Sequence, residues 1–481
     1  MSPKGELNGR VEPSRTTRFS SFAVRALGAL CVAGSLSGCL KTPDRFAASS
    51  LDVSMNPPAN FELDGKPLCF AGANNYYLAS KPRPMVDDVL QSAKALGFPV
   101  VRIWGYLDIG SLDGSVGHVD PWGDKVTGKK DGIYFQYWDP QQKRPLYNEG
   151  EDGLPKLDYV MAKAGELGIK IILVLTNNWY DFGGMDQYLT WYGRKKHHEF
   201  YTEPEVKQAF KNWIQHLVTR KNTVNGKLYR DDPAIFSWEL GNEPRCKGTG
   251  PASTGWTTQT LVTWADEMSS YIKSLDSNHM VSVGDEGFLN GGGEHWAYKA
   301  NDGVDHEALT ALPGIDFGTY HSYPEDWGAN LSWGDRWIVD HQRVARRLGK
   351  PTVLEEYGIK VTRNDNAVIT SGLESRLKVY ERWNALALSR GGNATMIWML
   401  GGLDTLYPAP NGLYHDYDGY TVFRGDESAN LLADVARRFA TEAPACRSAA
   451  PSTSPPSPFV RAQRTREAGA PVAFGWGLSD G

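Results

Sequence analysis

Short apolar runs recur between residues 68 and 398, and longer segments with helical spacing separate them. The runs are rich in β-branched and aromatic residues, as expected of strands that are buried on both faces. They cover residues 68–74, 100–104, 171–176, 235–240, 280–284, 317–321, 353–356 and 394–398. The helical segments include residues 86–96, 157–167, 204–220, 257–275, 333–348 and 373–388.

This alternation predicts the fold class. A strand followed by a helix, repeated eight times, most naturally closes as a (β/α)8 barrel of parallel strands. A doubly wound open sheet is the alternative, but no Gly-x-Gly-x-x-Gly pattern follows the first predicted strand. We therefore predict a single α/β domain, a TIM barrel with long loops after its strands.

Two segments that follow predicted strands are unusually long. Residues 179–199 are rich in aromatic residues and glycine, and residues 105–155 carry Trp122, Tyr134, Phe135, Tyr137 and Trp138. Loops at the carboxyl ends of barrel strands surround the site in this architecture, so we expect both segments to wall a cleft. The alternative is that each loop packs its own rings.

The N-terminus has the pattern of an export signal. Arginines precede the apolar segment 26–36, which is too short to span a bilayer as a stable helix. The segment leads into Leu-Ser-Gly-Cys at residues 36–39, which resembles the bacterial lipobox, whose cysteine is lipidated. We predict a lipoprotein signal over residues 1–38, a lipid on Cys39 and a tether over residues 39–59. A plain secretory cleavage and an uncleaved anchor are the alternatives.

These boundaries leave residues 60–443 for the predicted barrel domain. Beyond residue 443 the composition shifts to Ala, Ser, Pro and Arg, which bury too little apolar area to fold. We therefore predict that residues 444–481 form a disordered tail, and a shifted reading frame is the alternative explanation of their composition. The protein is expected to be exported, either to the bacterial cell envelope (outer membrane or cell surface) or into the medium.

Cysteine and histidine usage predicts no metal site. If Cys39 is lipidated and Cys31 is removed with the signal, three cysteines remain, which permits at most one disulfide. Cys69 lies on a predicted strand and is expected to be a small buried apolar residue. His197 and His198 are adjacent, so their side chains diverge, and we interpret them as polar loop residues.

The charge of the chain excludes nucleic acid as an expected partner. The net charge is −5, and lysine and arginine are dispersed rather than gathered on one face. The 16 Trp and 22 Tyr residues exceed what a core requires. Flat rings with a polar edge suit stacking on sugars, although packing remains the alternative for any single ring.

Two glutamates end predicted strands on opposite sides of the barrel. The run 235–240 leads into Asn242 and Glu243, and the run 353–356 ends in Glu356. In an eight-stranded barrel the ends of the fourth and seventh strands face each other across the mouth. Hydrolysis of a glycosidic bond uses such a pair, and a separation of about 5 to 5.5 Å indicates retention of configuration. The alternative is that each glutamate forms an ion pair at the rim.

Strand alternation also bears on the neighbouring Glu355. Adjacent residues of a strand point to opposite faces of the sheet, so we expect only one of Glu355 and Glu356 to enter the barrel. Glu356 directly precedes Tyr357 and Gly358, where the strand ends and a turn begins. We therefore choose Glu356.

Seven motifs in order resemble glycoside hydrolase family 5 of clan A, and within it the endo-1,4-β-mannanases of fungal and plant type. They span roughly residues 60–443. They are FAGANNYYL (70–78), VRIWGY (101–106), LTNNW (175–179), SWELGNEPRC (237–246), TYHSYPEDWG (319–328), PTVLEEYG (351–358) and MIWML (396–400).

The resemblance implies roles for the matching residues. Glu243 corresponds to the general acid/base and Glu356 to the nucleophile. Arg102, Asn242, His321 and Tyr323 correspond to the residues that support this pair. We expect the surroundings to keep Glu243 protonated, while Arg102 and Tyr323 keep Glu356 ionised.

The resemblance also implies four positions that bind substrate. Trp398 corresponds to the ring beneath the sugar that is cleaved, and Trp104 and Asn177 match positions that line subsites. Arg245 resembles the arginine of the aglycone side, although a loop salt bridge is an equal alternative.

A retaining endo-1,4-β-mannanase is the implied activity, acting on mannan, glucomannan or galactomannan. Another family 5 β-glycanase, such as an endo-β-1,4-glucanase or a β-mannosidase, is the alternative. A non-catalytic polysaccharide-binding lipoprotein is a second one. We expect a monomer that needs no cofactor, because two carboxyl groups and water suffice for the reaction. Contact with a membrane is expected only through the lipid.

Overall fold

The computed structural model describes residues 59–112, 132–248, 254–447 and 456–463. All of them belong to the unit Ser54–Gly481. The predicted signal and Cys39 fall in the other unit, Met1–Val53, which lies outside the described residues. Among the described residues, no helix is long and apolar enough to cross a membrane.

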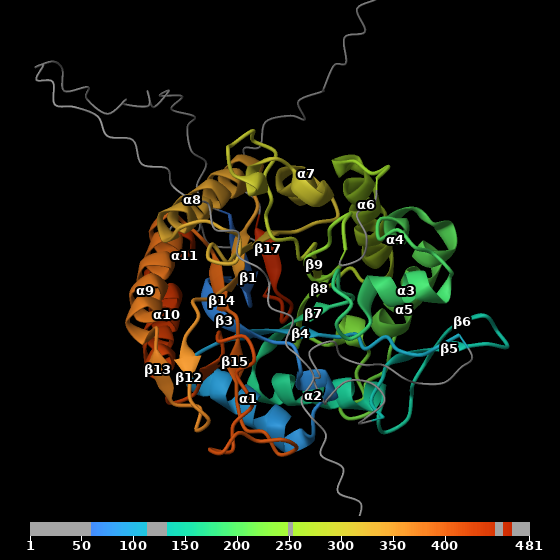
Figure 1. The fold of residues 1–481 in the computed structure, drawn as a ribbon, viewed down its shortest axis with the longest axis horizontal. Helices are drawn as coiled ribbons and strands as arrows, with labels where there is room; N and C mark the ends of the chain where they lie inside the picture. The colour runs from blue at the N-terminus through green and yellow to red at the C-terminus, as the bar shows by residue number, and fades with distance from the viewer. Residues whose placement is uncertain (1–58, 113–131, 249–253, 448–455, 464–481) are drawn as a thin grey trace, which may run out of the picture. The chain divides into compact units, whose positions relative to one another are not determined.

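Eight parallel strands form the central sheet and follow one another in chain order (Figure 1). The sheet nearly closes on itself, because the amide of Asp316 before the sixth strand donates to Val281 O on the fifth at 2.9 Å. This confirms the predicted TIM barrel. The strands are β3 (Phe70–Asn75), β4 (Val100–Trp104), β7 (Lys170–Val174), β8 (Ile235–Glu239), β9 (Met280–Ser282), β10 (Gly318–Ser322), β11 (Thr352–Tyr357) and β14 (Ala394–Ile397).

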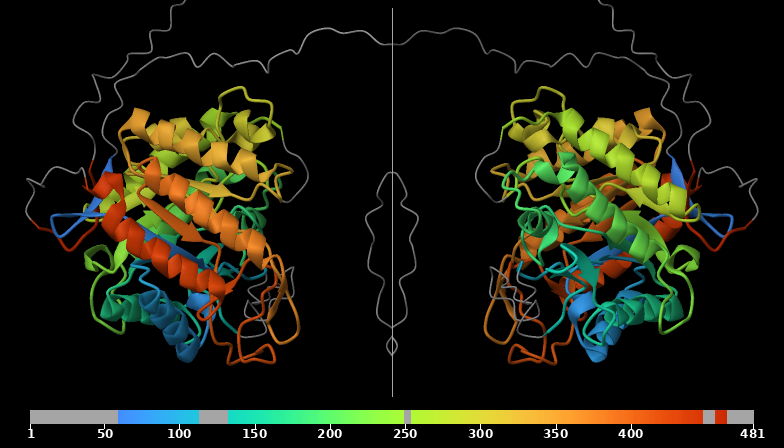
Figure 2. Two further views of the ribbon diagram at one scale, coloured as in Figure 1. Left: turned by 90° about the vertical axis from the view of Figure 1, so that its left-hand side faces the viewer. Right: turned by 90° about the vertical axis from the view of Figure 1, so that its right-hand side faces the viewer.

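Helices follow the strands and surround the sheet (Figures 1 and 2). The six predicted helices are confirmed, whereas α7 and α10 were not among the predicted ranges. Local signals set the ends: at α8 the Asn330 side chain accepts from Trp333 N, and Gly349, with φ 63°, ends the helix. The helices are α1 (Arg83–Ala95), α2 (Leu154–Leu167), α5 (Pro204–Val218), α6 (Thr258–Leu275), α7 (His306–Ala311), α8 (Leu331–Leu348), α9 (Leu373–Ser389) and α10 (Glu427–Glu442).

Aromatic rings fill the amino-terminal end of the barrel. β1 (Asn60–Leu63) places Phe61 against Phe236 and Phe317, with ring centroids 5.1 and 5.3 Å apart in edge-on geometry. All three rings are fully buried. Because this end is filled, the open face of the barrel is at the carboxyl ends of the strands.

The prediction that residues 444–481 are disordered is wrong for part of this segment. The short helix α11 (Pro444–Arg447) extends the end of α10, and β17 (Arg461–Gln463) pairs antiparallel with β1. Val460 is buried in the same apolar cluster as Phe61. The low-complexity composition concealed the few apolar positions and the cysteine that hold this segment in place.

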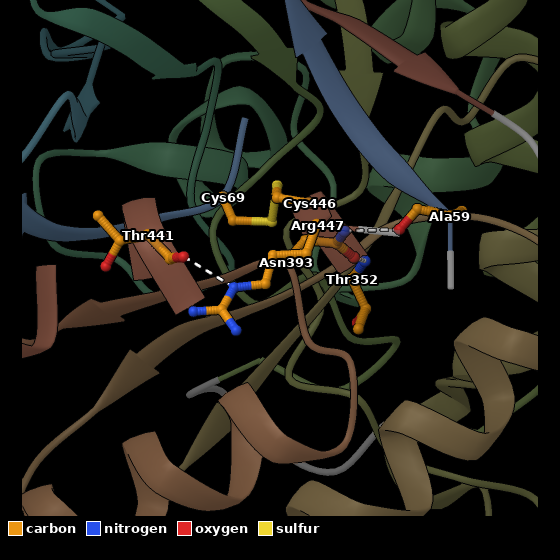
Figure 3. The surroundings of a disulfide bond; sticks show 7 residues. All are labelled: Ala59, Cys69, Thr352, Asn393, Thr441, Cys446 and Arg447. Atoms are coloured by element: carbon orange, nitrogen blue, oxygen red, sulfur yellow. Dashed lines mark hydrogen bonds between the residues drawn. A yellow bond between two sulfur atoms is a disulfide. The ribbon is translucent and has the colours of Figure 1, made fainter. Parts of the chain in front are cut away.

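A disulfide joins Cys69 to Cys446, with an S–S distance of 2.06 Å (Figure 3). Cys69 is therefore buried, as predicted, and takes part in the single disulfide that the cysteine count permits, a pairing that the sequence did not identify. Beside it, Asn393 Nδ2 donates to Ala59 O at 2.6 Å, and Asn393 Oδ1 accepts from Thr352 N at 3.0 Å (Figure 3). The two ends of the folded chain are thus tied to the base of the barrel.

The described rings of the long segment after β4 pack within the segment and against the second long loop. The segment contains the hairpin of β5 (Gln136–Asp139) and β6 (Arg144–Tyr147), and Tyr134 lies edge-on to Tyr137 at 5.7 Å. Trp138 stacks on Trp191 of the second loop at 6.3 Å, and Trp122 lies outside the described residues. The alternative of packed rings therefore holds for the part of this segment that is described.

We expect Cys446→Ser to lower the melting temperature by several degrees, because a disulfide of this kind contributes about 2–4 kcal/mol. Calorimetry with and without a thiol reductant would measure this. The control is Cys246→Ala, since Cys246 is buried and unpaired. Reductant should destabilise the wild type and the control but leave Cys446→Ser unchanged, and a reductant effect on Cys446→Ser would contradict the assignment.

Candidate active site

A cleft of about 310 Å³ opens at the carboxyl ends of the barrel strands. Both predicted catalytic glutamates line it, together with aromatic and charged residues from the loops. Its lining comprises Trp104, Trp179, Asp181, Asn242, Glu243, Arg245, Glu286, Tyr323, Asp326, Trp327, Glu356, Trp398 and Tyr420.

Glu243 lies in the turn after β8 and has an unusual backbone. Its φ is +51°, in the left-handed region that costs energy for a residue with a Cβ. The turn is held because Glu243 N donates to Gly284 O at 2.8 Å. A Cβ on Gly284 would lie 2.1 Å from Gly241 O, so this close approach requires glycine.

The carboxyl group of Glu243 is fixed at both oxygens. His321 Nδ1 lies 2.7 Å from Oε1, and the indole Nε1 of Trp179 donates to Oε2 at 2.6 Å. His321 is fully buried behind the cleft, at the end of β10. The carboxyl group therefore has one orientation.

Glu356 is held from two other strand ends. Its Oε1 accepts from Arg102 Nη1 at 2.5 Å, and its Oε2 accepts from the Tyr323 hydroxyl at 2.9 Å. Candidate ligand atoms of Glu243, His321 and Glu356 all lie within 4.8 Å of one another. The two carboxyl groups are thus close enough to act on one bond.

The expectation that only one of Glu355 and Glu356 enters the barrel is wrong. In the pairing of β10 with β11, Tyr320 faces Leu354 and His321 faces Glu356, so one extra residue is accommodated on β11. This bulge breaks the alternation that holds in a regular strand. As a result, Glu355 Oε2 lies 3.6 Å from Arg102 Nε, although Glu356 also contacts Arg102.

Arg102 connects several strand ends beneath the cleft. Its guanidinium is buried and donates to Glu239 at 2.8 Å, to Asn74 at 3.1 Å and to Asn242 Oδ1 at 2.8 Å, besides Glu356. The charges of these carboxylates raise its pKa further, although burial opposes this. Arginine therefore remains a fixed cation against which the carboxylates are placed.

Asn177 does not reach the cleft. It is fully buried at the end of β7, and its Oδ1 accepts from Asn242 Nδ2 at 3.0 Å. Because Asn242 also accepts from Arg102, its amide is oriented from both ends. Asn177 therefore positions Asn242 rather than lining a subsite as predicted.

The second long loop also supports the turn that carries Glu243. His197 lies in a turn, as predicted for a polar loop residue, but it is buried between Asp186 and Asn178. Asn178 Oδ1 in turn accepts from Arg245 N at 3.1 Å. These bonds connect the loop to the residues that follow Glu243.

The protonation order differs from our expectation. Burial acts to raise the pKa of Glu243, but the hydrogen bond and the charge of His321 outweigh it and lower the pKa to about 2. Burial raises the pKa of Glu356 more than nearby positive charges lower it. The pKa of His321 is well above its usual value, because Glu356 and Glu243 outweigh the opposing effect of burial. These directions favour the proton on His321 over Glu243, across a hydrogen bond of 2.7 Å.

Aromatic rings form the other side of the cleft. Trp398 follows β14, its peptide bond to Met399 is cis, and its Nε1 donates to Asp418 at 2.8 Å. Tyr76 stacks on Trp398 at 5.9 Å and lies 5.5 Å from Trp104. Trp104 and Trp398 thus line the cleft as predicted.

Arg245 makes the salt bridge that was its alternative, and it also lines the cleft. Its guanidinium binds both carboxyl oxygens of Glu286, at 2.5 and 2.7 Å, and reaches Asp302 at 3.0 Å. It also lies over the ring of Trp179, 5.1 Å from the centroid. A bidentate bond of this kind orients the guanidinium before any ligand arrives.

The sequence interpretation missed several residues of the site. Trp179 and Glu239 stood inside motifs that were quoted, yet neither was given a role. Tyr420 and Asp326 are joined by a hydrogen bond of 2.7 Å, and both line the cleft. Asp326 also stood inside a quoted motif, whereas nothing local in the sequence marks Tyr420, which comes from a loop 94 residues further along the chain.

The trio of Glu243, His321 and Glu356 has the composition of a cation site. The four carboxyl oxygens and His321 Nδ1 each have a protein partner, however, namely Trp179, Arg102, Tyr323 or one another. The geometry therefore fits a carboxyl pair joined by an imidazole, and we assign no metal to it. The expectation of a cofactor-free reaction continues to rest on the chemistry of paired carboxyl groups.

Comparison with known proteins agrees with the geometry. The model of the family described as GH family 5 beta-mannosidase-like matches residues 139–386. A probable mannan endo-1,4-beta-mannosidase C of Aspergillus terreus is 36% identical over 416 residues, which cover 85% of this chain and 95% of that protein.

Two solved structures are similar in both fold and sequence. The endo-1,4-beta-mannanase of Rhizomucor miehei aligns with a TM-score of 0.69 and 35% identity, over 81% of this chain and 99% of that one. The endo-beta-1,4-mannanase of Thermotoga petrophila aligns with a TM-score of 0.67 and 38% identity, over 79% of this chain and 78% of that one. Since the family model matches more than half of the chain, and the Aspergillus terreus protein is 36% identical and is covered over 95% of its length, the chain belongs to glycoside hydrolase family 5.

Proposed function

We propose that the protein is a retaining endo-1,4-β-mannanase that cleaves internal bonds of mannan, glucomannan or galactomannan. The observation that carries the proposal is the close approach of Glu243 and Glu356, within 4.8 Å through one atom each, in an open cleft. Carboxyl groups this close leave no room for a water between them and the sugar, which is the arrangement of retaining enzymes. The named relatives are mannan endo-1,4-beta-mannosidases and endo-mannanases.

The reaction then proceeds in two displacements. In the first, Glu356 attacks the anomeric carbon while Glu243 gives a proton to the leaving oxygen, so a glycosyl ester forms and the aglycone departs. In the second, Glu243 removes a proton from water, which attacks the same carbon and releases Glu356. Two inversions retain the configuration.

The hydrogen bonds of the site support this assignment of roles. Arg102 and Tyr323 donate to Glu356, which aims its carboxylate and stabilises the charge that returns to it when the ester breaks. Asn242 Nδ2 lies beside the pair and is oriented by Arg102 and Asn177, as a donor to the sugar 2-hydroxyl must be.

His321 supplies the proton that the first step consumes. It is hydrogen-bonded to Glu243, and transfer of its Nδ1 proton over 2.7 Å produces a protonated Glu243 and a neutral imidazole. The active form therefore needs one proton on the pair of Glu243 and His321 and none on Glu356. Neighbouring groups whose pKa values differ can take the separate roles of acid and base.

The lining of the cleft suits a polysaccharide. Trp398 and Trp104 offer ring faces on which sugars stack, and Arg245 offers donors on the aglycone side. The cleft is open, so a long chain can lie through it. A β-mannosidase that acts on chain ends, an endo-β-1,4-glucanase and a non-catalytic binder remain the competing functions.

Replacement of either glutamate tests the roles. We expect Glu243→Gln and Glu356→Gln to lose about 10²-fold to 10⁴-fold or more in the rate of reducing-end release from mannan. The melting temperature should change little, because the amide keeps the shape of the carboxyl group. The matched control is Glu325→Gln, an exposed glutamate in the loop after β10. Retained turnover in either active-site variant would contradict the catalytic role assigned to that glutamate.

An activated substrate separates the two roles. With a 2,4-dinitrophenyl β-mannobioside, whose leaving group needs no acid, Glu243→Gln should still release one equivalent of phenol rapidly, whereas Glu356→Gln should release none. Faster hydrolysis of carboxymethyl cellulose than of mannan would favour the glucanase, and mannose as the first product would favour the β-mannosidase. Affinity for mannan without any product would favour the binding protein.

The pH dependence of kcat/KM follows from the two proton sites. The acid limb should reflect Glu356, whose pKa is raised by burial, and the basic limb should lie above pH 6.5, because the pKa of His321 is raised well above this value. Activity is therefore lost on the basic side as the shared proton leaves. His321→Asn should move the basic limb down, whereas Tyr323→Phe, which removes a donor to ionised Glu356, should move the acid limb up. An unmoved basic limb in His321→Asn would contradict the role of His321 as proton donor.

We further propose that the protein is exported and lipidated on Cys39. The disulfide between Cys69 and Cys446 supports export, because such bonds persist in oxidising compartments. The Leu-Ser-Gly-Cys sequence at residues 36–39 supports the lipid. In a bacterial host grown with labelled palmitate, the wild type should carry label and sediment with membranes, while Cys39→Ser should do neither. An unlabelled wild type would exclude the lipid.

A further inference from the structure

Two buried carboxyl groups lie beneath the cleft and take no part in the two displacements proposed above. Glu239 ends β8, and Glu355 is turned into the barrel by the bulge in β11. Both side chains are completely buried, and neither lines the cleft. An isolated carboxylate in this buried position behind the catalytic pair would cost much free energy, so neighbouring groups must stabilise these two.

The contacts of these two groups are unequal. Glu239 accepts from Arg102 Nε at 2.8 Å and from Ser282 Oγ at 3.1 Å. Among the described residues, no donor makes a hydrogen bond to either carboxyl oxygen of Glu355. The nearest cations to Glu355 are Arg102 Nε and His321 Nε2, each 3.6 Å away.

A single proton shared by Glu239 and Glu355 accounts for their unequal contacts. Glu239 Oε1 and Glu355 Oε2 contact the same nitrogen, Arg102 Nε, at 2.8 and 3.6 Å. Two buried carboxyl groups this close to one another disfavour ionisation of both. Burial and the neighbouring carboxylate raise the pKa of Glu239 well above its usual value, whereas the pKa of Glu355 is lowered because Arg102, His321 and Glu239 outweigh burial. These directions favour one proton on Glu239 and one negative charge on Glu355.

The charge on Glu355 lies on the far side of both cations of the site. His321 presents Nε2 to Glu355 and Nδ1 to Glu243. Arg102 presents Nε to Glu355 and Nη1 to Glu356. The rear carboxylate and the reacting carboxylates therefore share the same two cations from opposite sides.

We propose that Glu239 and Glu355 are positioning residues, a proton-sharing carboxyl pair whose single negative charge holds His321 in the protonated form and fixes Arg102 against Glu356. The pair thereby determines the proton affinity of His321, which transfers its proton to Glu243. This rests on the proposed glycosidase function. The groups that face Glu355 are Arg102 from β4, Glu239 from β8, His321 from β10 and the adjacent Glu356.

Glutamine variants distinguish the effect of the proton on Glu239 from the effect of the negative charge on Glu355. Glu239→Gln replaces a protonated carboxyl group with a neutral one of the same shape, so the basic limb of kcat/KM should move least. Glu355→Gln leaves the charge only on Glu239, so the limb should move down further. The double variant removes the charge altogether, and its limb should fall by about one pH unit or more. The control is Glu62→Gln, a buried glutamate on β1 at the other end of the barrel.

The protonated carboxyl group can also be observed without any activity. In D₂O at neutral pH, the infrared carbonyl band of buried carboxylic acids should lose intensity in Glu239→Gln relative to the wild type, and should keep it in Glu62→Gln. The comparison between variants is needed because burial also raises the pKa values of Asp108 and Glu286. An unchanged band in Glu239→Gln, or a double variant whose basic limb stays in place, would overturn the proposal. If the band is present but no substrate is hydrolysed, the glycosidase function fails instead.

Discussion

The site depends on one buried cation. Arg102 stands at the end of the second barrel strand and is held by Glu239, Asn74 and Asn242 while it fixes Glu356. Its charge cannot be removed by any ordinary change of pH, so it is the one fixed electrostatic reference among groups that exchange protons. Because its partners come from different strands, the closed barrel is what brings them within reach.

His321 is the second centre of the site, and its charge can change. It lies between Glu243 and Glu355, and each of its ring nitrogens faces a carboxyl group. An imidazole in this position can hold a proton for the acid and release it over one hydrogen bond. The hydrogen bond and charge of His321 lower the pKa of Glu243, so they favour the proton on His321 at rest, and this agrees with the proposed role of Glu243 as the acid.

The bulge in β11 is a small irregularity with a large effect. It admits Glu355 to the barrel beside Glu356 and so adds a fourth carboxyl group to a space that holds two cations. The carboxyl groups outnumber the cations, so burial favours a proton on at least one of them. Irregular strands of this kind are often found beside active sites, where they redirect a side chain.

The sequence by itself determined the strand order, the barrel and the position of Glu243 and Glu356 at opposite strand ends. These follow from local periodicity and from the rule that parallel strands end on one face. Only the tertiary structure decided that Glu355 also enters, that Asn177 lies behind Asn242, and that Cys69 pairs with Cys446. The tertiary structure also decides which group holds the proton, since this depends on distances of a few ångströms between side chains of different strands. The pattern along one strand contains no record of its partner's register, and so these features could not be predicted from it.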